Sequence, residues 1–362
     1  MPEPALAAAD RAVLLVNLGS PDSPEVADVR RYLDQFLMDG RVLDLPWPVR
    51  RLLVSIILRT RPKRSAEAYA SIWTDEGSPL KVHARDLAAA LDARIDMPVR
   101  WAMRYASPSI EDVLLELAAE GIRHVEFVAL YPHWAMSTSE TSIVEAERVI
   151  RKHDLDMTLA PMAPFYDEAG YIEVLANAAR ECLHEDDHLL FSYHSVPERH
   201  IWKTDPTGEH CLKVENCCQV DNPAAHSRCY RHQAFVTSEL VAAALGLPRD
   251  RWSVSFQSRI GRTKWIEPYT DKTLEAMPSQ GIQRLAVMCP AFVADNLETL
   301  EEIGIEGREI FEEAGGERYT LIPCLNARPD WVEFLARALE GDPVRHASPP
   351  PTALAADAAA NG

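Results

Sequence analysis

The sequence predicts an α/β protein with two similar domains, each a doubly wound parallel sheet, and an active-site cleft between them. A buried-strand pattern opens the chain at residues 12–18 and stops at Gly19-Ser20-Pro21-Asp22. Helical and strand patterns then alternate to about residue 340, which is typical of a mostly parallel sheet. An internal repeat indicates that this alternation is divided between two related halves.

The repeat consists of two matching strand-and-helix units. Gly121-Ile122-Arg123 leads into a strand at 125–130, and Gly281-Ile282-Gln283-Arg284 leads into a strand at 285–289. Each strand ends near a proline and runs through a loop into an acidic helix, expected at 139–148 and 295–302. Two halves that meet near residues 160–170 are the simplest explanation, and chance similarity is the alternative. Facing doubly wound domains bind ligands at the carboxyl ends of their strands.

These patterns predict three segments. The first domain covers residues 8–165 and includes an apolar lip at 45–63. The second covers 166–342 and includes a cysteine-rich insertion at 205–232. The tail at 343–362 has too few large apolar residues to form a core, so we expect it to be disordered.

Charge and hydropathy exclude several classes of protein. The 362 residues carry a net charge of −18 without a dominant basic face, which argues against nucleic-acid binding. The N-terminus has no basic, apolar signal-peptide pattern, and no apolar run approaches the ~20 residues that span a bilayer. We therefore expect a cytoplasmic protein whose seven cysteines stay reduced.

Two sets of residues follow predicted strands in the second half. His194 stands at the end of the strand 188–193, either in an active site or as a core histidine bonded to the backbone. After the strand at 285–289, a helix is expected to carry Asp295, Glu298 and Glu302 on one face, with Glu306 one turn further. Such a stripe is usually a solvated face, but here it leads towards the same cleft as His194. Carboxylates in that position suit cation delivery or proton removal.

A third segment, residues 256–269, mixes aromatic, hydroxyl and basic side chains near a strand end. This mixture suits a flat apolar ligand with acidic edges, although surface loops often have the same composition.

Taken together, these motifs resemble the ferrochelatase family, in particular its bacterial members with an internal cysteine-rich insertion. The similarity runs from about residue 12 to residue 340. Its motifs, in order, are Asn17-Leu18-Gly19-Ser20-Pro21, Gly77-Ser78-Pro79-Leu80, Met103-Arg104-Tyr105, Tyr131-Pro132 with Ser137-Thr138-Ser139, Tyr193-His194-Ser195-Val196-Pro197, Gln257-Ser258-Arg259 through Trp265, and Asp295 through Glu302.

The resemblance implies two Rossmann-like (chelatase) domains that insert Fe²⁺ into protoporphyrin IX, the terminal step of heme biosynthesis. It implies that His194 and Glu298 bind the iron on opposite sides of the ring, with Glu302 a further catalytic candidate. It also implies substrate contacts: Ser258 near a propionate, Leu18 and Trp265 on the ring faces, and Tyr105. Asn296 stands where animal members carry a histidine, and residues 59–63 match the family only loosely.

The reaction removes two pyrrole protons while an aqua ion loses its waters. An imidazole and a carboxylate can each act as transient ligand or base. A tight cleft can favour a bent ring whose nitrogen lone pairs are exposed. The sequence leaves open which of His194 and Glu298 delivers the metal and which takes the protons.

Four cysteines fall within nineteen residues: Cys211, Cys217, Cys218 and Cys229, with His210, His226 and His232 among them. This density favours a metal site, either zinc or an iron–sulfur cluster. No Cys-x2-Cys pair is present, which weakens the zinc interpretation. The resemblance implies a [2Fe–2S] cluster.

Residues 45–59 are apolar with basic flanks, and Leu52, Leu53, Ile56 and Ile57 are predicted to share a helical face. A core helix and an exposed lip explain the pattern equally well. By resemblance the segment covers the porphyrin cleft, and it could also touch the inner face of the membrane.

Other functions fit part of this pattern. One is a chelatase that uses coproporphyrin III or another metal, which product analysis would separate. The other is a heme or Fe–S sensor without catalysis, which predicts an altered His194 or Glu298. Both residues are present.

Overall fold

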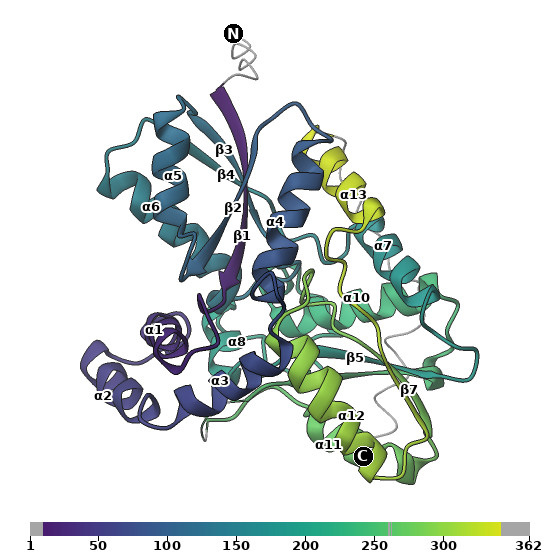
Figure 1. The fold of residues 1–362 in the computed structure, drawn as a ribbon. Coiled ribbons are helices and arrows are strands. Elements are labelled where there is room, and N and C mark those ends of the chain that lie inside the picture. Colours follow the sequence, from purple (N-terminus) through teal and green to yellow (C-terminus); the bar gives the residue numbers. More distant parts are fainter. Residues whose placement is uncertain (1–9, 260, 262, 342–362) are drawn as a thin grey trace. The chain divides into compact units, whose positions relative to one another are not determined.

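A computed structural model describes residues 10–259, 261 and 263–341 (Figure 1). The described chain divides into two compact units. Unit 1 comprises the described residues up to Tyr131, Met136–Ala163 and those from Asn326 onward. Unit 2 comprises Pro132–Ala135 and the described residues of Pro164–Leu325. The predicted tail at 343–362 lies outside the described residues.

Unit 1 is built on a four-stranded parallel sheet in the order β2-β1-β3-β4. The strands are β1 (Arg11–Gly19), β2 (Val99–Tyr105), β3 (His124–Ala129) and β4 (Thr158–Pro161). The helices are α1 (Val26–Leu37), α2 (Trp47–Ile57), α3 (Arg61–Ile72), α4 (Pro79–Asp92), α5 (Ile110–Ala119), the π-helix η2 (Met136–Glu140), α6 (Thr141–Lys152) and α13 (Pro329–Leu339).

Unit 2 repeats this plan with the order β6-β5-β7-β8, again all parallel. The strands are β5 (His188–His194), β6 (Trp252–Gln257), β7 (Arg284–Met288) and β8 (Arg318–Leu321). The helices are α7 (Ala169–Arg180), α8 (Glu198–Thr204), α9 (Pro223–His226), α10 (Tyr230–Ala244), the 3-10 turns η3 (Arg249–Arg251) and η4 (Pro278–Gln280), α11 (Thr270–Ala276), the π-helix η5 (Glu298–Glu306) and α12 (Gly307–Glu313).

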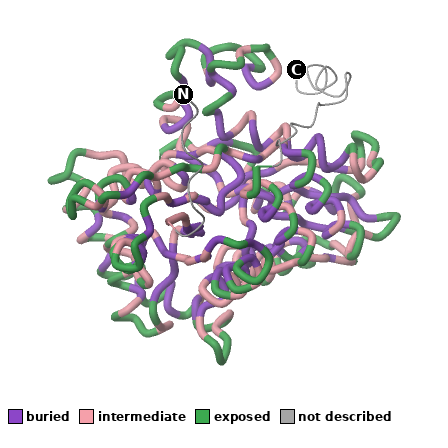
Figure 2. The backbone as a smooth tube through the Cα atoms, turned by 90° about the horizontal axis from the view of Figure 1, so that it is seen from above, coloured by how far each residue is buried: buried purple, intermediate pink, exposed green. Residues whose placement is uncertain are grey.

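Both first strands are buried on both faces, as helices on two sides of a sheet require. In β1 the side chains of Leu14 and Val16 are fully buried against the apolar faces of α5 and α6. In β5 Leu190 is equally buried, and beside it Val287 of β7 packs with Phe311 of α12. Figure 2 colours the buried residues of the backbone purple. The strands expected at 12–18, 125–130, 188–193 and 285–289 are therefore confirmed.

The two sheets match residue by residue at their carboxyl ends. Asn17 pairs with Met103 in unit 1, and Tyr193 pairs with Phe256 in unit 2. Met103 donates its backbone N–H to the carbonyl of Pro108, five residues on, and Phe256 donates to that of Pro268, twelve residues on. Both prolines follow cis peptide bonds, and Met103 and Phe256 are equivalent positions of the two sheets. One residue beyond Asn17 and Tyr193, Leu18 and His194 therefore occupy the same position of the repeat.

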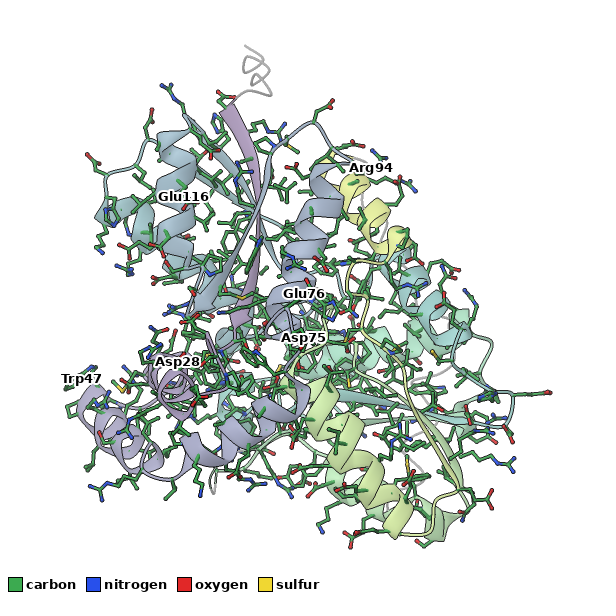
Figure 3. All side chains as sticks on the ribbon, viewed as in Figure 1. Asp28, Trp47, Asp75, Glu76, Arg94 and Glu116 are labelled. Atoms are coloured by element: carbon green, nitrogen blue, oxygen red, sulfur yellow. The ribbon has the colours of Figure 1, made fainter. Side chains whose placement is uncertain are left out.

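The helices that follow the fourth strands belong to the opposite units. Helix α7 follows β4 of unit 1, yet it packs on α10 in unit 2. Helix α13 follows β8 of unit 2, yet it packs on α4 in unit 1, where Glu333 forms an ion pair with Arg94 at 2.8 Å. Arg94 is labelled in Figure 3.

The acidic helices of the repeat differ from the prediction. Each begins as a π-helix that continues into an α-helix, so that η2 precedes α6 and η5 precedes α12. Because η5 begins at Glu298, Asp295 lies in the loop before it, and the predicted helical face shared by Asp295, Glu298 and Glu302 is wrong. Among the described residues, no helix is long and apolar enough to cross a membrane.

Gly19, at the end of β1, provides a test of the strand-end packing. Its φ is +120°, and a Cβ there would lie 2.1 Å from the Tyr105 carbonyl oxygen. We predict that Gly19→Ala lowers the free energy of unfolding by about 3 kcal/mol or more, because the strain and the clash add. Chemical denaturation followed by circular dichroism measures the loss.

Gly77→Ala is the matched control. Gly77 has φ of +117° but no atom within 4 Å of the added Cβ, so it reports the backbone strain alone. Equal losses in the two variants would contradict the close approach of β1 and β2.

Candidate active site

The candidate site of unit 2 lies at the carboxyl edge of its sheet. Strand β5 ends at His194, which is paired with Gln257 at the end of β6. On its other side β5 pairs with β7, and the chain leaves β7 through a loop into η5. From β5 the chain thus runs first to β6 on one side and later to β7 on the other side. This reversal is the point at which doubly wound folds bind ligands.

His194 is half-buried and its tautomer is fixed by the backbone. Its Nδ1 lies 2.6 Å from the carbonyl oxygen of Ser195. Because a carbonyl has no proton, Nδ1 must be the donor, and the lone pair of the neutral ring is left on Nε2. The ring meets Phe292 edge-on, with 6.3 Å between centroids. Phe292 was not selected from the sequence, although its position just after β7 indicates the same edge.

The residues after His194 are held by the end of β6 and by the segment that ends at Ile266. Ser195 donates its N–H to the Gln257 carbonyl at 2.7 Å, and Ile266 donates to the Val196 carbonyl at 3.1 Å. Pro197 and Trp265 face each other in the antiparallel bridge formed there. This pairing fixes His194 and Trp265 within one local structure of unit 2.

Ser258 connects β6 to the acidic π-helix. It follows the last residue of β6 and has φ of +63°, an uncommon conformation for a residue with a Cβ. Its Oγ–H donates to Glu302 Oε2 at 2.5 Å. A serine hydroxyl has one proton to donate, and here the acceptor is a carboxylate of the protein.

Glu302 is a carboxyl at this edge whose pKa is raised. Burial raises its pKa above the usual glutamate value, and the nearby charge of Glu298 raises it further. The hydrogen bond from Ser258 and the field of His194 act in the opposite direction. The carboxyl therefore interacts electrostatically with both predicted iron-binding residues, His194 and Glu298. It holds a proton more readily than an exposed glutamate does.

Glu298 and Glu302 lie four residues apart on the π-helix η5, and they share a face of it, as they would on an α-helix. Hydrogen bonds in a π-helix close from residue i to i+5, so a spacing of four residues is slightly less than one turn. The last bond of η5 runs from the Gly307 N–H to the Glu302 carbonyl.

Asp295 has a different environment from the two glutamates. It is buried, and its Oδ1 accepts from Thr299 Oγ1 at 3.1 Å and from the Cys324 N–H at 3.3 Å. Its carboxylate joins the loop before η5 to the segment after β8.

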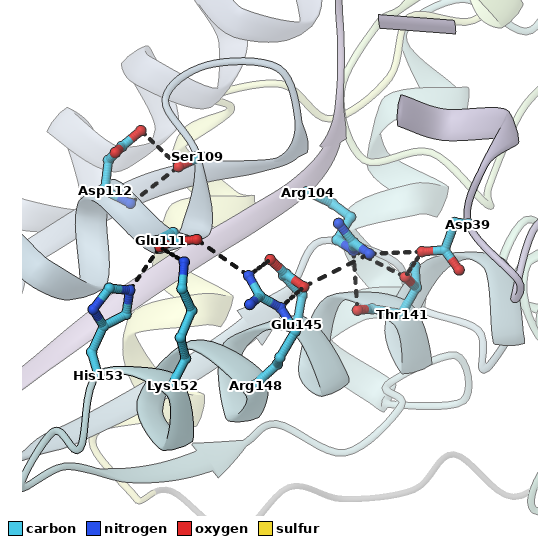
Figure 4. A network of polar contacts seen from close by, with 10 residues as sticks. All are labelled: Asp39, Arg104, Ser109, Glu111, Asp112, Thr141, Glu145, Arg148, Lys152 and His153. Atoms are coloured by element: carbon cyan, nitrogen blue, oxygen red, sulfur yellow. Dashed lines mark hydrogen bonds and ion pairs between the residues drawn. The ribbon is translucent and has the colours of Figure 1, made fainter. Parts of the chain in front are cut away.

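Two predicted substrate contacts lie in unit 1. Leu18 is half-buried at the end of β1, and its N–H donates to the Tyr131 hydroxyl at 2.9 Å. Tyr105 is buried, and its hydroxyl donates to Asp39 Oδ2 at 2.9 Å. Figure 4 shows the same Asp39 carboxylate approached by Arg104 and Thr141, at 2.7 and 2.5 Å. The cleft expected between the two domains stays a prediction.

The cysteine-rich segment brings its four thiols together within unit 2. Hydrogen bonds link Cys217 to Cys218, Cys218 to Cys229, and Cys229 to Cys211. All four side chains are buried and none forms a disulfide. Among the described residues, no three His, Cys, Asp or Glu side chains surround a common point as the ligands of a single metal ion would.

Mutual contact and burial raise the pKa of three of these thiols, Cys217, Cys218 and Cys229. The hydrogen bond with Cys218 raises the pKa of Cys217, and the bond with Cys211 raises that of Cys229 to about 12. For Cys218, the bond with Cys217 lowers the pKa, but the bond with Cys229 and burial outweigh it and raise the pKa to about 11.

Comparison with known proteins decides the family. The ferrochelatase family model matches residues 10–342. The chain is 55% identical over 337 residues to the ferrochelatase of Pseudomonas fluorescens (strain Pf0-1), covering 92% of this chain and 99% of the relative. It is 56% identical over 330 residues to that of Stutzerimonas stutzeri (strain A1501), covering 91% and 97%. The chain belongs to the ferrochelatase family.

Solved structures support the fold. SirB from Bacillus subtilis with Fe³⁺ aligns with a TM-score of 0.51 at 12% identity, covering 91% of this chain and 94% of that chain. The sirohydrochlorin chelatase SirB from Bacillus subtilis subspecies spizizenii, in complex with cobalt, aligns with the same score and coverage at 11% identity. At such identities the likeness concerns the fold alone. The predicted pair of Rossmann-like, parallel-sheet domains is confirmed.

Membership of the ferrochelatase family also confirms the predicted reaction, the insertion of iron into a porphyrin in heme synthesis. Fe²⁺ is a substrate of this reaction. The coproporphyrin chelatase and the non-catalytic sensor are not favoured.

Proposed function

We propose that this ferrochelatase inserts Fe²⁺ into protoporphyrin IX at the carboxyl edge of the unit 2 sheet, where His194, Glu298 and Glu302 carry the chemistry. The observation that supports this most strongly is the environment of Glu302. It accepts a hydrogen bond from Ser258 and interacts electrostatically with both His194 and Glu298. Such coupling of a perturbed carboxyl with an imidazole is typical of catalytic sites.

The reaction defines what the side chains must do. A neutral porphyrin carries two pyrrole N–H groups, and Fe²⁺ arrives with bound waters. As the four ring nitrogens bind Fe²⁺, two protons leave the ring and the waters leave the metal. The protein therefore needs acceptors for two protons and transient ligands for the cation.

His194 and the two glutamates supply these groups. The Nε2 lone pair of His194 can accept a pyrrole proton or ligate iron while Nδ1 stays bonded to Ser195. Because burial raises the pKa of Glu302, this carboxylate retains an accepted proton better than an exposed one. Glu298, at the start of η5, serves with His194 as the iron ligand.

The porphyrin contacts rest on the family resemblance. Leu18 and Trp265 would line the ring faces, with Tyr105 a further contact. For Ser258 to bind a propionate, its hydroxyl would have to exchange Glu302 for the substrate. Such an exchange would remove a hydrogen bond that stabilises the charged form of Glu302, and would raise its proton affinity as substrate binds.

The central prediction concerns His194 and Glu298. His194→Ala should abolish turnover, because it removes the Nε2 lone pair at the strand end. Glu298→Gln keeps volume and hydrogen bonding but removes charge and basicity, so the rate should fall by ~10²-fold or more. An anaerobic assay with Fe²⁺ and protoporphyrin IX measures turnover, and fluorescence quenching measures porphyrin binding, which should survive.

The matched control is Glu309→Gln, an exposed glutamate of α12 that follows η5. It should insert iron at the wild-type rate. A near-native rate for either His194→Ala or Glu298→Gln would remove that residue from the mechanism.

We also propose that Cys211, Cys217, Cys218 and Cys229 hold a [2Fe–2S] cluster. The four thiols are buried and follow one another through pairwise hydrogen bonds, and four cysteine thiolates are the usual ligand set of a [2Fe–2S] cluster. When a metal binds, the thiols release their protons to solvent, because the metal compensates the thiolate charges. The bound cluster would supply one-electron redox chemistry.

This proposal predicts the content of the purified protein. Wild type isolated without oxygen should be coloured and should contain iron and acid-labile sulfide in equal amounts. Cys229→Ala should lose both, whereas Cys182→Ala, at a half-exposed cysteine outside the segment, should keep them. Stoichiometric zinc without sulfide would replace the cluster with a zinc site.

We further propose that α2 rests on an anionic lipid surface on the cytoplasmic side of a membrane. Trp47, Leu52 and Ile56 are 61, 65 and 53% exposed, a large apolar area for one short helix. Trp47 is labelled in Figure 3 at the start of α2. The exposed basic residues Arg59 and Arg61 follow directly, although the whole protein is acidic. An apolar helix face with adjacent cations suits lipid headgroups.

Of the four residues predicted to share one face of this helix, three are exposed: Leu52, Leu53 and Ile56. Ile57 packs instead against the small core formed with Val54 and Leu58. The pattern supports an exposed lip for most of α2, anchored on one side.

The double variant Leu52→Ser with Ile56→Ser should bind anionic vesicles at least ~10-fold more weakly, because two apolar side chains leave the interface. Vesicle co-sedimentation measures binding, and the thermal midpoint should stay unchanged. Leu115→Ser, at an exposed leucine of α5, is the control and should bind as wild type does. Equal binding by the double variant would exclude α2 as the membrane contact.

A further inference from the structure

Three histidines of the cysteine-rich segment converge on two consecutive backbone carbonyls. His210 Nε2 and His226 Nε2 lie 2.7 and 2.9 Å from the carbonyl oxygen of Cys217. His232 Nδ1 lies 2.9 Å from the carbonyl oxygen of Cys218. A carbonyl cannot donate, so each of these ring nitrogens carries a proton and donates it.

The backbone conformation explains why these carbonyls need donors. Cys217 and Cys218 are the two central residues of a turn in which the Gln219 N–H donates to the Asn216 carbonyl at 2.7 Å. In such a turn the outer carbonyl is satisfied, whereas those of the central residues point away from the turn. Both cysteines are buried, and an unpaired carbonyl in such a place is costly. The imidazoles satisfy both.

The rings also support one another. His226 and His232 stack at 3.6 Å between centroids with 9° between planes, and His210 meets His226 at 5.3 Å. The histidines thus form one packed layer over the turn.

The sulfur atoms of the same two cysteines have donors of their own. The Leu212 N–H points to Cys217 Sγ at 3.3 Å, and Arg231 Nη1 points to Cys218 Sγ at 3.3 Å. The turn is therefore held at its carbonyls by imidazoles and at its sulfurs by an amide and a guanidinium. Donors to thiolate sulfur are typical of the surroundings of metal-bound cysteines.

We propose that His210, His226 and His232 are positioning residues that hold the Cys217–Cys218 turn in the shape needed for both sulfurs to bind the cluster, without being ligands themselves. Adjacent residues of an extended chain point to opposite sides, so two neighbouring cysteines can serve one cluster only when the backbone is bent. The histidine layer fixes that bend. This inference rests on the proposed [2Fe–2S] cluster and deepens it.

The test compares two replacements of His232 in the full chain. His232→Asn keeps an N–H close to the position of Nδ1, whereas His232→Phe keeps the stacked ring and removes the donor. We expect His232→Phe to lose iron and sulfide to a chelator about 10- to 100-fold faster than wild type, and His232→Asn to stay near wild type. The control is His124→Phe, which alters the first residue of β3 in unit 1 and should behave as wild type.

A second readout does not depend on the cluster. In metal-free protein, iodoacetamide should alkylate Cys217 and Cys218 faster in His232→Phe than in wild type or His232→Asn, as followed by peptide mass spectrometry. Loss of the cluster spectrum in both variants would make His232 a ligand and overturn the proposal. Equal alkylation rates in metal-free wild type and His232→Phe would also overturn it. A wild type without sulfide but with protected thiols would refute the cluster while leaving the histidine layer standing.

Discussion

The parallel pairing of β5 with both β6 and β7 is the constraint on which the site of unit 2 depends. Because parallel strands end at the same edge, the residues that follow β5, β6 and β7 are brought together whatever their distance in sequence. His194, Ser258 and Glu302 come from these three places. The buried sheet therefore sets the positions, and the loops supply the chemistry.

Electrostatics then gives that edge its character. A carboxyl buried beside a second carboxyl is unfavourable, and Ser258 and His194 offset this only in part. In unit 1 the pKa of the buried carboxyl Asp39 shifts the other way. Burial raises this pKa, but the hydrogen bonds that Asp39 accepts and the nearby Arg104 outweigh burial and lower it. Tyr105 and Ser258 occupy equivalent strand-end positions, and each donates its hydroxyl to a carboxylate, but these carboxylates come from different parts of the repeat and their pKa values shift in opposite directions.

Much of this could be predicted from the sequence, because strand ends are local features. The apolar run before His194 and the glycine-led repeat each predicted a strand, and the repeat predicted two related sheets. The π-form of η5 could not be predicted, since its composition does not separate it from an α-helix. Asp295 was misplaced for a different reason, because the helix begins three residues later than predicted, at Glu298. The bond from Ser258 to Glu302 joins residues 44 positions apart and follows only from tertiary packing. The sequence shows three histidines among the cysteines. That they bond to two consecutive carbonyls, those of Cys217 and Cys218, could not be predicted, because it depends on the turn that these residues form.

The exchange of α7 and α13 between the units has a consequence for how the protein is made. Unit 1 contains β1 to β4, but α13, which packs on its helix α4, is encoded after the whole of unit 2. A ribosome therefore releases all the strands of the first sheet long before the helix that covers part of it. The second unit has α7 available from the beginning of its own synthesis. During translation, then, unit 2 can complete its packing first, and unit 1 closes only when α13 emerges.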